Sequence, residues 1–173
     1  MCLKIKSFAK AEHDITCYKI LYSAKGANGY LRFYTPFEEK LVSPKCISGD
    51  KLFEAEYPSY WGVETRINTI KDLESMLQYT GSTEISVGFI HSYKNLSDLE
   101  DRKNVGFYRW MRSVPLGGEC RVIHIFECVI PKGTLYCEGY INDSDTVLGY
   151  AAKKVIFKKE LELPESIREE YCC

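Results

Sequence analysis

Runs of β-branched and aromatic residues recur along the whole chain, which contains thirteen tyrosines and eight phenylalanines. Such residues fit the pleated, half-buried surface of a sheet, so each run predicts a β-strand. The strands expected on this basis span residues 17–23, 30–34, 51–56, 85–93, 107–112, 120–130, 134–137 and 154–160.

Helical periodicity is clearest at residues 70–79, where apolar side chains recur on one face. Thr69, just before this segment, and Asp72, within its first turn, have the spacing of a capping box. Shorter helices are predicted from Ser97 and after Pro164, which gives two or three short helices in all. Because strands outnumber helices and do not alternate regularly with them, the pattern favours an α+β fold with a largely antiparallel or split sheet.

Length and composition indicate an ordinary folded domain. The 173 residues suffice for one well-filled core but are few for two, so we expect one globular domain spanning residues 1–173. The hydrophobic fraction of 45% argues against disorder. The 23 basic and 24 acidic residues leave a net charge of −1 and no global positive field, so nucleic-acid binding is not expected.

The chain lacks features of secretion and of membrane insertion. Its first residues have no apolar signal run, and no segment approaches the roughly 18 apolar residues of a membrane span. We therefore expect a cytoplasmic protein whose eight cysteines stay reduced. No metal site is expected, because Cys120, His124 and Cys128 are each four residues apart, about 13 Å along one strand.

Residues 120–130 are apolar on both faces, which is typical of a strand in the middle of a fold. Alternation places His124 between Val122 and Phe126 on one face, where we expect it to be structural. Glu127 lies on the other face, among isoleucine and valine. A carboxylate in such surroundings reaches water or a basic partner, or it is aimed into a cleft.

The run of residues 127–136, ECVIPKGTLY, resembles the strand that carries the catalytic glutamate of mono-ADP-ribosyltransferases. In that family a Glu precedes an apolar pair, a Pro, a turn and an aromatic residue. The resemblance implies NAD as cofactor and Glu127 as the catalytic residue, which would hold the ribose and stabilise the charge that develops as nicotinamide leaves. The family often has a second Glu or Gln two residues earlier, where this chain has Ile125.

The same resemblance implies further residues of an NAD site. Lys19, which follows a tyrosine, would replace the Arg or His that grips the dinucleotide, and Tyr93 or Tyr136 would stack on nicotinamide. His91 has two interpretations: a neutral histidine that holds one backbone carbonyl, or a catalytic group that grips a ligand or exchanges a proton. An NAD site requires Lys19, His91 and Glu127 to converge on one pocket.

A broader resemblance links the C-terminal half to small uncharacterised proteins carried by phages and gut bacteria. It covers the strand at residues 88–93, the turn at 130–134 and the closing segment at 149–155. This resemblance implies a mobile-element origin, and a common function of phage proteins of this size is to bind and disable a host protein.

Tyr57, Tyr60 and Trp61 form an aromatic cluster in a Pro- and Gly-containing turn. The cluster either covers the core or lies exposed, where it would be the best candidate for a partner-binding hot spot. The sequence therefore supports two functions. The leading one is a non-enzymatic cytoplasmic protein, without a cofactor, that engages and inhibits or modulates a host macromolecule. The alternative is an NAD-dependent mono-ADP-ribosyltransferase, or a nucleotide-binding relative that lost the activity. Whether the chain forms a homo-oligomer stays open.

Overall fold

The computed structural model describes residues 3–25, 31–34, 41–42, 54–56, 67–85, 88–100, 122–141 and 146–163. Within these ranges eleven strands form one sheet, every pairing is antiparallel, and two helices accompany it, which is an α+β architecture. The strands are β1 (Leu3–Lys10), β2 (Ile15–Lys25), β3 (Leu31–Tyr34), β4 (Leu41–Val42), β5 (Glu54–Glu56), β6 (Glu84–Ile85), β7 (Ile90–Tyr93), β8 (Val122–Ile130), β9 (Leu135–Ile141), β10 (Leu148–Ala152) and β11 (Lys154–Leu161). The helices are α1 (Ile70–Thr80) and α2 (Ser97–Glu100).

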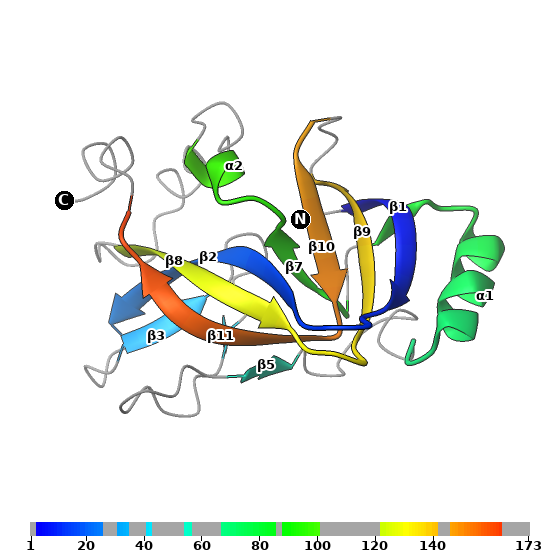
Figure 1. Cartoon of the computed structure of the whole chain (residues 1–173), viewed down its shortest axis with the longest axis horizontal. Helices are drawn as coiled ribbons and strands as arrows, with labels where there is room; N and C mark the ends of the chain where they lie inside the picture. Colours follow the sequence, from blue (N-terminus) through cyan, green and yellow to red (C-terminus); the bar gives the residue numbers. More distant parts are fainter. Residues whose placement is uncertain are drawn as a thin grey trace.

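The sheet consists of two halves that are joined weakly. Its strand order is β5-β11-β8-β2-β7-β10-β9-β1-β6, with β3 added to β2 and β4 to β3. β2 pairs with β8 along Ile15–Ser23, whereas β2 and β7 share the single register pair Tyr18 and Tyr93. In Figure 1 the strands of the β2, β8 and β11 half run across those of the β1, β9 and β10 half. The pairing of β2 with β7 is therefore the narrowest in one continuous sheet, and we call this narrow junction the split.

Each half of the sheet buries side chains on both faces. One core cluster contains Ile125 together with Leu73 and Met76 of α1, and we call this side of the sheet the Ile125 face. The other cluster contains Phe126 and Phe157, and we call this side the Phe126 face. Successive residues of β8 alternate between the two clusters, as expected for a strand in the middle of the fold.

The local signals of α1 predict its position well. Thr69 accepts a hydrogen bond from the Asp72 amide while the Asp72 carboxylate accepts one from the Thr69 amide, which completes the predicted capping box. Gly81 ends the helix in the left-handed region, with φ of 63°. Hydrogen bonds from the Asn68 amide and then from Thr69 to the charged carboxylate lower the pKa of Asp72.

The structure corrects two strand predictions. The segment expected as one strand at 85–93 consists of β6 and β7, and Gly88 between them has a φ of 77° that a strand does not accommodate. β1, β4 and β10 were not among the strands predicted from composition. The closing segment at 149–155 overlaps both β10 and β11, which are separated at Lys153. The expected strand at 107–112 and the expected helix after Pro164 lie outside the described residues.

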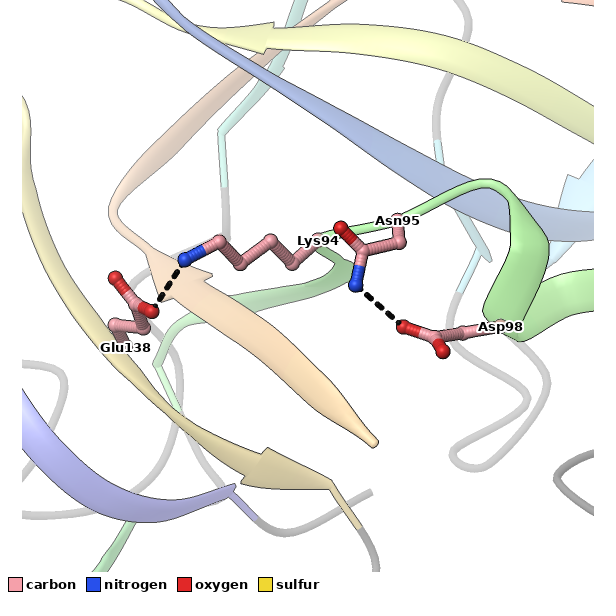
Figure 2. A network of polar contacts seen from close by, with 4 residues as sticks. All are labelled: Lys94, Asn95, Asp98 and Glu138. Carbon is pink, nitrogen blue, oxygen red and sulfur yellow. Dashed lines mark hydrogen bonds and ion pairs between the residues drawn. The ribbon is translucent and has the colours of Figure 1, made fainter. Parts of the chain in front are cut away.

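A polar network holds the end of β7 to its neighbours (Figure 2). The Lys94 ammonium donates to Glu138 Oε1 of β9 at 2.7 Å, and so reaches across β10, which lies between the two strands. This hydrogen bond raises the pKa of Lys94. Asn95 Nδ2 donates to Asp98 Oδ2 at 3.0 Å and fixes the turn into α2.

Neither described helix combines the length and the apolar character that crossing a bilayer would require.

Candidate functional site

Lys19 and Glu127 lie on opposite faces of the sheet. The register of β2 and β8 places Tyr18 opposite Glu127 and Lys19 opposite Phe126, without a bulge. Residues directly opposite each other on paired strands project to the same side of a sheet. Glu127 therefore lies on the Ile125 face and Lys19 on the Phe126 face.

The other predicted NAD-site residues divide between the same two faces. Tyr93 belongs to the Ile125 cluster, and His91, two residues earlier on β7, shares its face. Tyr136 packs on the Phe126 cluster, with its ring edge-on to Tyr150 at 5.8 Å between centroids. The structure thus brings Glu127, His91 and Tyr93 to one side and Lys19 and Tyr136 to the other.

The Lys19 side chain is buried at the junction of the two halves. Its ammonium donates a hydrogen bond of 2.6 Å to the carbonyl oxygen of His91 on β7. Because β2 and β7 share a single register pair, this bond adds to the connection between the two strands. A buried ammonium needs such acceptors to offset the loss of its hydration.

The His91 imidazole is also directed at a backbone carbonyl. Its Nε2 lies 3.0 Å from the carbonyl oxygen of Ile85, and a carbonyl only accepts, so Nε2 carries the proton. The side chain is buried. This contact is the one expected if His91 is a neutral histidine that holds a backbone carbonyl.

Glu127 begins a row of three side chains across the split. Tyr18 lies opposite both Glu127 on β8 and Tyr93 on β7, so the three project to the same side. Glu127 is half-buried, and Lys159 of β11 is its other cross-strand neighbour. Burial, and then the charge of Asp98, raise the pKa of Tyr93 to about 12, which keeps its hydroxyl neutral. The sequence did not single out Tyr18, because only the register decides which of two adjacent residues shares a face with Glu127.

A second polar row, on the Phe126 face, was not predicted. Ser23 Oγ lies 2.7 Å from His124 Nε2, and His124 Nδ1 lies 2.6 Å from Glu160 Oε1. The three residues come from β2, β8 and β11, and they are far apart in the sequence. No local motif could have indicated this arrangement, and the alternation along β8 predicted only a structural role for His124.

Two buried thiols face each other beside Lys19. Cys17 and Cys128 are opposite each other on β2 and β8, and both are free. Burial raises the pKa of Cys17 to about 11, although contact with Ser92 and the charge of Lys19 act the other way. The Ser92 hydroxyl has no hydrogen-bond partner of ordinary geometry in the described part of the chain. Within the same residues, no three His, Cys, Asp or Glu side chains gather as metal ligands.

The predicted partner-binding residues Tyr57, Tyr60 and Trp61 lie outside the described residues.

Comparison with family models, with curated proteins and with solved structures finds no match.

Proposed function

We propose that this chain is a cytoplasmic binding protein that engages and modulates a host macromolecule through its aromatic cluster, Tyr57, Tyr60 and Trp61. One structural observation favours this function over NAD chemistry: Lys19 and Glu127 project from opposite faces of the sheet. A dinucleotide gripped by Lys19 would not be within reach of Glu127.

The polar groups at the split also serve the fold itself. The Lys19 ammonium and the His91 imidazole are both directed at backbone carbonyl oxygens.

Large aromatic side chains are the residues that dominate binding hot spots between proteins. Two tyrosines and a tryptophan within five residues therefore make the segment around Trp61 the strongest candidate for contact with a partner.

Affinity capture from host-cell lysate tests this function. The wild-type chain is expected to retain one saturable partner at micromolar concentration, and Trp61→Ala to lose it. Tyr79→Ala is the matched control, because Tyr79 is an exposed aromatic residue of α1, with 88% of its surface accessible. Absence of a saturable partner, or equal capture by the wild type and Trp61→Ala, would contradict the proposal.

The alternative function, NAD-dependent ADP-ribosyl transfer, is favoured by the row of Glu127, Tyr18 and Tyr93. These side chains share one face where the two halves of the sheet meet, and a split sheet is the arrangement expected of that family. In this alternative, Glu127 would stabilise the positive charge of the ribose in the transition state, and Tyr18 would take the position expected of Lys19.

Incubation with labelled NAD, with and without host lysate, distinguishes the two functions. Binding alone predicts no label transfer, no release of nicotinamide and no thermal shift with NAD. Label transfer that is lost in Glu127→Gln and kept in Glu138→Gln would instead establish the alternative. Glu138 suits the control because it is a half-buried glutamate of β9 that pairs with Lys94.

A further inference from the structure

We propose that Ser23, His124 and Glu160 form a catalytic site that hydrolyses small esters, with Ser23 as nucleophile, His124 as general base and Glu160 as the residue that positions His124. This activity goes beyond the proposed binding function and uses none of its residues.

Three adjacent strands place the row. β8 lies between β2 and β11, so His124 has Ser23 on one side and Glu160 on the other. Glu160 is opposite Phe126, and Leu21 is opposite His124, so both registers put the row on the Phe126 face. The His124 ring also stacks on Phe126, with 6.2 Å between centroids and 25° between planes, which limits its rotation.

The hydrogen-bond partners of His124 indicate which of its ring nitrogens carries the proton. Glu160 Oε1 is a carboxylate oxygen, which accepts, so the neutral imidazole carries its proton on Nδ1. Nε2 is then the acceptor, and the Ser23 hydroxyl donates to it across 2.7 Å. A nucleophile bonded to a base, and a base oriented by a third group, is the arrangement that activates serine in hydrolases of unrelated folds.

Burial is uneven along the row. Ser23 is 1% exposed, whereas the side chains of His124 and Glu160 are 12% and 53% exposed. Because Ser23 and His124 are largely shielded from water, the charge of Glu160 supports a protonated His124 more strongly than it would in bulk water. Because Ser23 is 1% exposed, a substrate reaches Oγ only when the side chains that cover it move, which favours a small acyl group, and we infer short-chain esters as the class.

The reaction balances with water as the only co-reactant. Ser23 Oγ bonds to the ester carbonyl carbon as its proton passes to His124 Nε2. The carbon–alkoxy bond then breaks, and the alcohol leaves with that proton. Water then attacks the acyl carbon and gives a proton to Nε2. The bond from that carbon to Ser23 Oγ breaks, the acid is released, and Oγ takes the proton back from Nε2.

A small ethoxy fluorophosphonate with an alkyne handle tests the site in the full-length protein. Ser23 Oγ should form a bond to phosphorus as the phosphorus–fluorine bond breaks, and peptide mapping of the wild-type adduct should locate it on Ser23. His124→Gln should slow labelling by about 10²- to 10⁴-fold. Ser92→Ala, which removes another buried hydroxyl from the same face, should label at the wild-type rate.

The positioning role of Glu160 is tested by measuring the labelling rate together with the melting temperature. Glu160→Gln keeps the shape of the side chain but cannot stabilise a protonated imidazole, so it should slow labelling while leaving the melting temperature near that of the wild type. Glu160→Asp should restore part of the rate. The proposal is overturned if the folded wild type carries no adduct on Ser23, or if His124→Gln labels Ser23 as fast as the wild type.

Discussion

At the scale of single residues, the buried ammonium of Lys19 helps to hold the two halves of the sheet together. Its buried ammonium connects β2 to the His91 carbonyl of β7, at a junction with a single register pair. A hydrogen bond from a charged donor contributes about 1.5–3 kcal/mol, and a buried acceptor left without its donor costs about 1–3 kcal/mol.

We therefore expect Lys19→Met to lower the free energy of unfolding by about 1–3 kcal/mol. Amide hydrogen exchange should also become faster in β7. Lys94→Met is the control: Lys94 forms a partly exposed ion pair with Glu138, so its removal should cost less than about 1 kcal/mol. Urea denaturation and exchange measured by mass spectrometry test both variants, and unchanged exchange in Lys19→Met would contradict the structural role of Lys19.

The buried thiol of Cys17 makes stability depend on alkaline pH. Its folded pKa, about 11, lies above the ordinary value of 9.0. As the pH rises from 9 to 11, the unfolded thiol loses its proton and the folded thiol keeps it, so the free energy of unfolding falls. Two pKa units correspond to a loss on the order of 2 kcal/mol.

Cys17→Ser should show a smaller loss of stability between pH 9 and 11 than the wild type, because serine does not ionise in this range. Urea denaturation at several pH values measures the difference. Parallel curves for the two proteins would mean that the Cys17 thiol ionises as easily in the folded state as in the unfolded state.

At the scale of elements, β8 contributes to both core clusters. Ile125 is fully buried and belongs to the cluster that also contains residues of α1. We expect Ile125→Ala to lower the free energy of unfolding by about 2–5 kcal/mol, because the lost methyl groups leave a cavity. Lys158→Ala, on the exposed part of β11, should change it by less than about 0.5 kcal/mol. Chemical denaturation measures the free energy of unfolding of both variants. Equal losses in the two would contradict the position of β8 in the core.

The elements that the sequence predicts well are those whose signals are local. α1 begins at a capping box formed by Thr69 and Asp72, and β8 is a largely apolar run of nine residues. The break at Gly88 was missed because glycine also occurs inside strands, and only its φ of 77° distinguishes a turn. The candidate site is harder to predict: whether Lys19 or Tyr18 shares a face with Glu127 depends on the register of β2, which pairing with a distant strand determines.

At the scale of the whole molecule, the sheet consists of two halves joined at Tyr18 and Tyr93, and the functional alternatives differ in how they use that junction. NAD chemistry requires the groups around it to face one site. The structure instead divides them between two faces, and leaves the separate row of Ser23, His124 and Glu160 on one of these faces.

The most direct test of this account is the set of side-chain nuclear Overhauser effects in the isotope-labelled chain. We predict contacts from Tyr18 to both Glu127 and Tyr93, and a contact from Lys19 to Phe126, because each pair is directly opposite in the sheet. Contacts between the Lys19 methylenes and the Glu127 side chain would contradict the account, since they would place both residues on one face and restore the NAD site that the sequence first indicated.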